Sequence, residues 1–155
     1  MPGTTIPFSL HGIGTGVLNT VAVEGSEHDV TIEGHPAFGG TESHLSPLDL
    51  VLSSLVACTQ VTGKIVATGM KAAVLGKWDI KLESHLDNSV LVFGEDGISN
   101  FSDVSLAVSV ESNLSGDDFS HFTSEIERRC PITTLFRGSG VEYKMSWTRL
   151  PLSED

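Results

Sequence analysis

The chain has 155 residues and a formal net charge of −11, with 39% hydrophobic and 19% charged residues. This length suits one domain, and the composition excludes wholesale disorder. The first Lys or Arg is Lys64, so the cationic surface that nucleic acids and anionic membranes attract is missing. We therefore predict a single domain over residues 1–155 that binds neither nucleic acid nor a membrane.

The N-terminal segment "MPGTTIPFSLHGIGTGVLN" has no basic start and no long apolar run. It does not look like a signal peptide, and we predict a cytoplasmic protein. Two cysteines in a reducing compartment do not form a permanent structural disulfide, although they can form a transient one.

The first predicted elements are two strands, 16–23 and 28–34, both rich in Val, Ile and Thr and joined by the turn "EGSE". The preceding "GIGTG" is expected to be a flexible lead-in. Residues 35–46 contain Pro36 and the pair Gly39–Gly40 and are predicted to form a loop.

A long helix is predicted from Ser46 to Thr68. Ser46 is a good N-cap, Pro47 suits the first helical position, and Asp49 resembles the third-position acid of a capping box. The first half, "LVLSSLVAC", is apolar or small on every side, which is typical of a helix buried all round. Because one sheet covers only one side of such a helix, we predict that a second subunit covers the other.

The second half of the chain alternates between strands and helices. The patterns predict a strand at 77–86, a strand or an irregular segment at 89–97, a strand at 101–114, a helix after Ser115, a short helix from Pro131 to Gly138, and a last strand at 141–150. This order indicates an α+β fold with antiparallel sheet.

Cys58 and Cys130 are the two cysteines of the chain. Cys58 lies on the same helix face as Leu55 and Thr62, so it is either a small buried hydrophobe or a reactive thiol. Cys130 is predicted where one helix ends and a helix beginning with Pro131 starts. The helix N-terminus would stabilise a thiolate there, and the arginines nearby in the sequence would do the same; they are Arg128, Arg129 and Arg137.

Other chemistry has weaker support. The six His are scattered and no Cys-x-x-Cys occurs, so we predict no metal, and no Gly-rich phosphate motif follows a strand, so we predict no cofactor. A Cys–His pair remains open, because His35 and His44 precede the long helix.

Two segments resemble the OsmC/Ohr family of thiol-dependent hydroperoxide reductases and their relatives. One is "FGGTESHLSPLDLVLSSLVACT", a Gly-Gly loop followed by a helix that leads to Cys58. The other is "ERRCPITTLFRG", a helix end followed by Cys-Pro and a short helix. The resemblance implies an OsmC-like fold, with antiparallel sheets around a long buried central helix, and an intertwined homodimer.

The resemblance also implies a mechanism. Cys58 would attack an organic hydroperoxide and become a sulfenic acid, Cys130 would condense with it to a disulfide, and an external thiol would restore the dithiol. The implied partners are therefore a second copy of the chain, a small organic hydroperoxide or another apolar ligand, and a thiol reductant.

Two positions depart from the family's peroxidases. A Glu follows the Pro in those proteins, whereas Leu48 stands here and the nearest acid is Asp49. They also carry an N-terminal Arg that holds the first cysteine as a thiolate, whereas no Arg precedes Arg128 here. We predict that Arg129 supplies the missing cation. The alternative function is an OsmC-like ligand-binding or redox-sensing dimer with little peroxidase turnover.

Overall fold

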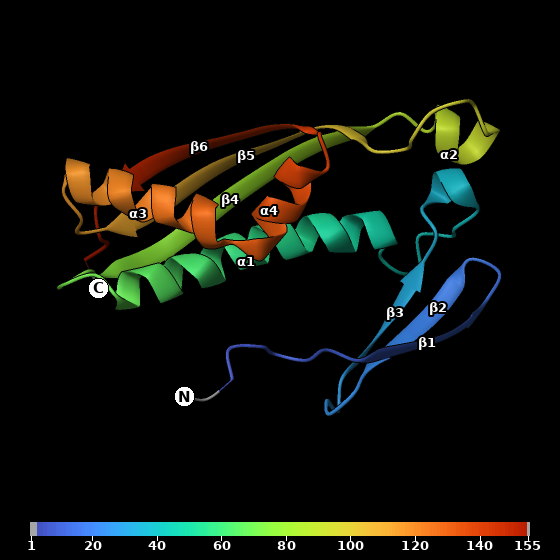
Figure 1. Ribbon diagram of the computed structural model, residues 1–155, viewed down its shortest axis with the longest axis horizontal. Helices are drawn as coiled ribbons and strands as arrows, with labels where there is room; N and C mark the ends of the chain where they lie inside the picture. The colour runs from blue at the N-terminus through green and yellow to red at the C-terminus, as the bar shows by residue number, and fades with distance from the viewer. Residues whose placement is uncertain (1–2, 155) are drawn as a thin grey trace. The chain divides into compact units, whose positions relative to one another are not determined.

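The computed structural model describes residues 3–154. Within the single predicted domain, the chain forms two compact units, Met1–Val51 and Leu52–Asp155. Each unit contains one three-stranded sheet (Figure 1). The fold is α+β, as predicted.

The N-terminal unit is an antiparallel meander in the order β1-β2-β3. Its elements are β1 (Leu10–Thr15), β2 (Leu18–Val23), β3 (Asp29–Glu33) and the 3-10 turn Pro36–Phe38. The predicted strands at 16–23 and 28–34 are confirmed with slightly shorter bounds. The flexible lead-in predicted at "GIGTG" is wrong, because these residues belong to β1 and its turn into β2.

Glycine makes this first strand possible. A Cβ on Gly14 would collide with the backbone of Leu18 and with Asn19, and a Cβ on Gly12 would lie 2.8 Å from the Asn19 side chain. The missing side chains let β1 pair closely with β2. A Gly-rich strand carries little of the apolar alternation by which strands are recognised, which explains the missed prediction.

Glu33, at the end of β3, forms hydrogen bonds with the loop that follows. Its carboxylate accepts hydrogen bonds from the Thr41 amide at 3.0 Å, the Thr41 hydroxyl at 2.9 Å and the Ser43 amide at 3.1 Å. The Thr41 hydroxyl and amide lower the pKa of the Glu33 carboxyl below its ordinary value because they stabilise the charged form. One buried carboxylate thus satisfies two backbone amides of the segment between the 3-10 turn and α1.

Helix α1 (Pro47–Thr68) begins as the sequence predicts. The Asp49 amide donates to Ser46 Oγ at 3.1 Å, and the Asp49 carboxylate accepts from the Ser46 amide at 3.0 Å and hydroxyl at 2.6 Å. This reciprocal arrangement is a capping box with Asp in place of Glu. Such a cap typically contributes about 1 kcal/mol to helix stability.

The C-terminal unit packs helices against the sheet β4-β5-β6 (Figure 1). Besides Leu52–Thr68 of α1, it contains β4 (Leu75–Leu86), α2 (Ser89–Phe93), β5 (Phe101–Ser112), α3 (Gly116–Arg129), α4 (Pro131–Gly138) and β6 (Glu142–Leu150). The segment left open at 89–97 therefore contains a short helix.

The topology of this sheet corrects one prediction. β4 pairs antiparallel with β5, but β5 pairs parallel with β6. A parallel neighbour needs a long crossover connection, and α3 and α4 together provide it. Alternation of apolar and polar side chains indicates which face of a strand is buried, but it gives no information on the direction of the neighbouring strand. The sequence pattern therefore did not distinguish parallel from antiparallel pairing of β5 with β6.

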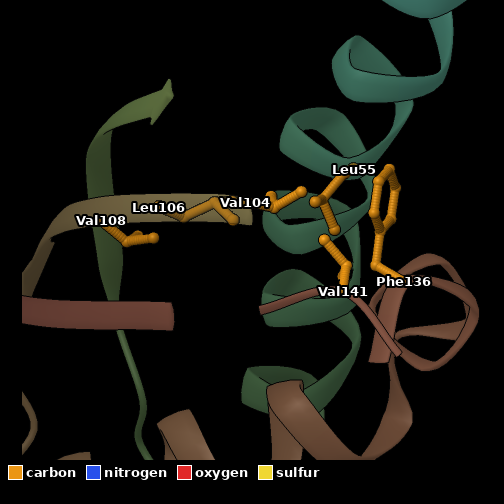
Figure 2. Packing of buried hydrophobic residues seen from close by; sticks show 6 residues of the cluster. All are labelled: Leu55, Val104, Leu106, Val108, Phe136 and Val141. Atoms are coloured by element: carbon orange, nitrogen blue, oxygen red, sulfur yellow. The ribbon is translucent and has the colours of Figure 1, made fainter. Parts of the chain in front are cut away.

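The core lies on one face of this sheet. Four alternate residues of β5 are at most 1% exposed, as predicted: Val104, Leu106, Val108 and Val110. Leu55 of α1, Phe136 of α4 and Val141 cover one end of this row (Figure 2), and Phe122 and Ile126 of α3 cover the other together with the last turns of α1. The sheet therefore holds α1, α3 and α4 against one surface.

Helix α1 is not buried all round within one chain. Leu55, Thr59 and Val66 are buried, but Val61 and Ile65 are 58% and 55% exposed. By length and composition alone α1 could cross a membrane, yet it supplies core residues to the C-terminal unit. The prediction that a second subunit covers the other side of α1 stays a prediction, and within one chain an apolar face of α1 is uncovered.

Candidate dithiol site

Cys58 lies in the middle of α1, at the edge of the buried face. Its side chain is partly exposed. Its sulfur lies 3.8 Å from the Thr62 hydroxyl, one helical turn further on, which is within the range of a weak sulfur hydrogen bond. Cys58 is thus accessible enough to meet a small molecule.

Cys130 occupies the junction between α3 and α4 and is completely buried. Its backbone ends α3, because its amide donates to the Ile126 carbonyl at 2.9 Å. Its side chain caps α4, because Cys130 Sγ accepts a hydrogen bond from the Thr133 amide at 3.5 Å. Pro131 takes the first helical position, where its missing N–H is not needed.

The two thiols are neighbours in the fold. Cys58 and Cys130 lie far apart in the sequence, but the fold brings their side chains close enough for each to shift the pKa of the other. The neighbouring thiol raises the pKa of Cys58 and lowers that of Cys130.

The surroundings set the two thiol pKa values in opposite directions. Burial raises the pKa of Cys58, and the neighbouring Cys130 adds to this increase, while Thr62 opposes it. Burial also acts to raise the pKa of Cys130, but the Thr133 hydroxyl, the Thr133 amide and Cys58 together bring it below the ordinary value. Hydrogen bonds from Thr133 therefore offset the effect of burial at Cys130.

A polar chain leads from Cys130 to strand β6. Thr133 Oγ1 lies 3.2 Å from the hydroxyl of Tyr143, and the guanidinium of Arg137 lies 4.9 Å from the centre of the Tyr143 ring. Arg137 in turn pairs with Glu127 at 2.9 Å, and Glu127 also accepts from the Trp147 indole. Thr133 is completely buried, so this network fixes its rotamer.

Asp49 and Arg129 have other partners in the structure. The Asp49 carboxylate is engaged in the α1 cap, and its bonds to Ser46 lower its pKa. Arg129 lies 3.9 Å from Glu125, which also forms two hydrogen bonds with Arg128. The predicted roles of Asp49 and Arg129 at the thiols remain predictions.

His35 has a structural role in the N-terminal unit. His35 Nδ1 accepts from the Ala37 amide at 3.1 Å and caps the short 3-10 turn. Across residues 3–154, no cluster of three or more His, Cys, Asp or Glu is placed to hold a metal ion. A hollow between α1 and β4, lined in part by Lys64 and Trp78, contains neither cysteine.

Sequence reasoning missed Thr133 and Tyr143. A signal for Thr133 was present, because an N-cap side chain accepts from the amide three residues later and Cys130 was already placed before α4. Tyr143 offered no local signal, because only the parallel docking of β6 on β5 brings it to the crossover helices.

The family model described as OsmC-like protein matches residues 40–146, which include both cysteines. The chain belongs to the OsmC-like protein family. The resemblance drawn from the Cys58 and Cys130 segments is thereby confirmed. A comparison with curated proteins gave no match.

Solved OsmC-like structures share the fold over almost the whole chain. An OsmC-like protein from Mycoplasma pneumoniae superposes with a TM-score of 0.76 at 18% identity, covering 94% of this chain and 98% of its own. An organic hydroperoxide resistance protein from Elizabethkingia anophelis gives 0.74 at 16%, with 95% and 99% covered. The OsmC organic hydroperoxide resistance protein from Legionella pneumophila gives 0.69 at 17%, with 94% and 99% covered. These superpositions establish a common fold.

Proposed function

We propose that this OsmC-like protein is a cysteine-based hydroperoxide reductase that acts on organic peroxides. Cys58 is the thiol that attacks, and Cys130 is the thiol that resolves the oxidised product. The observation that supports the proposal is the proximity of two thiols that the sequence separates widely, which is close enough for each to shift the pKa of the other. Family membership and the hydroperoxide resistance proteins among the structural neighbours support a role in redox stress.

The accessibility of the two sulfurs supports this division of roles. Cys58 is partly exposed, whereas Cys130 is completely buried. A peroxide from solvent therefore meets Cys58 first. The exposed apolar side chains of α1, such as Val61 and Ile65, favour an alkyl peroxide over hydrogen peroxide.

The reaction balances as a two-electron reduction. The Cys58 sulfur attacks one oxygen of ROOH, the O–O bond breaks, and Cys58 becomes a sulfenic acid while RO⁻ leaves and takes a proton from solvent to give an alcohol. Cys130 then attacks the Cys58 sulfur, and the sulfenic oxygen leaves as water when the disulfide forms. An external dithiol reduces this disulfide by exchange.

The proposed assembly is a cytoplasmic homodimer. The motive is the apolar face of α1, which one chain leaves uncovered. A second copy of the same helix is an occupant of matching chemistry, and such pairing is the common way to bury an apolar surface in a symmetric oligomer.

A second function stays open, in which the dimer binds a ligand or senses oxidants without efficient turnover. The observation that favours it is the raised pKa of Cys58, because a protonated thiol is a poor nucleophile. The absence of any Arg before Arg128 points the same way. The two functions differ in turnover, since a sensor is oxidised once and waits for an external signal to be reset.

Peroxide consumption with a dithiol reductant distinguishes these functions. We expect the wild type to consume cumene and t-butyl hydroperoxide faster than hydrogen peroxide. Cys58→Ser should abolish consumption, and Cys130→Ser should prevent the intramolecular disulfide, which mass spectrometry detects. Oxidation of wild type that stops after one equivalent of peroxide, with dithiol present, would favour the sensor. Equal turnover by Cys58→Ser would reject both functions.

A further inference from the structure

We propose that the hollow between α1 and β4 binds a small organic monocarboxylate with an apolar or aromatic body. The hollow has a volume of about 260 Å³ and is lined by residues of α1, of β4 and of the turn before β4, all within the C-terminal unit. Pockets for drug-sized ligands measure about 300–1,000 Å³, so this one suits a smaller molecule, of the size of benzoate. The inference goes beyond the proposed function and does not depend on it, because the hollow contains neither cysteine.

One wall of the hollow is a polar ridge on α1. Gln60, Lys64 and Thr68 follow one another at intervals of four residues, so their side chains lie along one face of the helix. Gln60 and Lys64 are exposed, so a ligand can reach them from solvent. Among residues 3–154, no acidic side chain lines the hollow. A wall with one ammonium group and no carboxylate attracts an anion.

Two donors on this ridge have no partner in the part of the chain that the structure describes. Neither the Lys64 ammonium nor the Gln60 carboxamide forms a hydrogen bond or an ion pair within residues 3–154. The Thr68 hydroxyl is different, because it donates to the Lys64 carbonyl at 2.9 Å. The unused donors are thus one ammonium and one carboxamide, one helical turn apart. They suit the two oxygens of a single carboxylate.

The charge of the hollow selects a monoanion. Dianionic phosphates bind where several arginines or backbone amides converge, most often at a helix N-terminus. Among the lining residues that the structure describes, Lys64 is the one cation. The ridge also runs toward the C-terminal end of α1, where the helix dipole places partial negative charge. A second negative charge on the ligand would meet no second cation, so a carboxylate fits better than a phosphate.

The opposite wall is apolar and held in place by packing. It contains Leu75 and Trp78 of β4, with Ala73 in the turn before the strand. Trp78 lies against Gly63 of α1, where a Cβ would be 2.7 Å from Trp78 Cζ2, so the indole needs glycine at this position. The Trp78 ring also meets Trp147 edge-on, with 6.3 Å between the ring centroids. This preformed wall suits the apolar or aromatic body of a ligand.

The hollow and Cys58 lie on different faces of α1. Because each residue advances about 100° around a helix, Gln60 and Lys64 are turned from Cys58 by about 120–160°. A ligand in the hollow therefore leaves the Cys58 thiol uncovered. Binding at this site and the proposed peroxidase reaction can fail or succeed independently of each other.

An NMR titration of the whole protein with benzoate tests the site directly. Benzamide, acetate and phosphate are compared with benzoate at constant ionic strength, and the Gly76 amide and the Trp78 indole N–H report on the hollow. We expect benzoate to shift both signals saturably and to bind at least about tenfold more tightly than benzamide, which has no charge, or acetate, which has no ring. The proposal is overturned if benzoate gives no saturable shift, if benzamide or acetate binds equally well, or if phosphate binds more tightly.

Two lysine variants separate the hollow from the overall charge of the protein. Lys64→Met removes the ammonium group of the ridge, whereas Lys81→Met removes an exposed lysine of β4 that does not line the hollow. Both variants change the net charge by the same amount. We expect Lys64→Met to weaken benzoate binding at least about tenfold and Lys81→Met to leave it unchanged. Equal effects of the two variants would mean that the net charge controls binding, which contradicts the proposal.

Alkylation of Cys58 separates this site from the dithiol. The rate at which iodoacetamide modifies Cys58 is measured by mass spectrometry with and without saturating benzoate. We expect no change in this rate, because the hollow lies on another face of α1. If benzoate slows the alkylation, and does so equally in Lys64→Met, benzoate binds beside Cys58 and the assignment of the hollow is wrong.

Discussion

The two three-stranded sheets of this chain use similar residues but bury them very differently. In β4-β5-β6, alternate residues of the central strand are almost completely covered by α1, α3 and α4. In β1-β2-β3, Leu10 and Ile13 are 60% and 70% exposed, and Phe8 before the sheet is 81% exposed. Alternation of apolar and polar residues along a strand indicates that its apolar face can be buried. Whether that face is buried depends on the helices or strands that pack against it. The C-terminal unit supplies its own partners, whereas the N-terminal unit leaves apolar surface that needs cover from outside itself.

Truncation of one phenylalanine in each unit gives the largest expected contrast. Phe122 is 0% exposed and Phe8 is 81% exposed. Phe122→Ala should lower the free energy of unfolding by about 3–5 kcal/mol, because it leaves a cavity in the core of the C-terminal unit. Phe8→Ala should change it by less than about 0.5 kcal/mol. Urea denaturation at low protein concentration measures both values. Equal losses would mean that the N-terminal segment is packed as tightly as the core.

Disruption of the apolar face of α1 tests whether a second copy covers it. Val61 and Ile65 lie one turn apart on this face and are more than half exposed. The double change Val61→Asp and Ile65→Asp should raise the dissociation constant of the proposed dimer at least about a hundredfold, because two charges would be desolvated at the interface. Sedimentation velocity measures this change. Val74→Asp, also at an exposed apolar residue, serves as a control and should leave association unchanged. A wild type that sediments as a stable folded monomer at micromolar concentration excludes the dimer.

Acid should open the loop after β3 locally, and this is the smallest of the three expected effects. Hydrogen bonds from Thr41 and Ser43 lower the pKa of Glu33, so the charged carboxylate stabilises the loop fully above the ordinary pKa of 4.5. This contribution is lost as the pH falls through the lowered value. Amide exchange at Thr41 and Ser43, corrected for the intrinsic rate, should therefore rise below about pH 4. Glu33→Gln should remove this pH dependence, and a wild-type profile as flat as that of the variant would contradict the role of the charge.

The sequence predicted most of the elements and both thiols, because these depend on local patterns. Ser46 and Asp49 indicated the start of α1, and the pair Cys130-Pro131 indicated the break between α3 and α4. The Gly-rich strand β1 was missed because glycine contributes no apolar pattern. The parallel partner of β5 and the contact of Tyr143 with Thr133 were missed because each depends on how distant segments dock.

The same topology sets the order in which the site can be assembled. Cys130 and Thr133 lie in the crossover that connects β5 to its parallel neighbour β6, and Tyr143 lies on β6 itself. Contacts that close long loops form slowly in folding, and β6 is synthesised after the other two strands of its sheet. The complete network around the dithiol therefore forms only when the final strand has docked. A chain that lacks β6 would carry both cysteines without the Thr133–Tyr143 contact, so the redox chemistry that we propose would depend on completion of the fold.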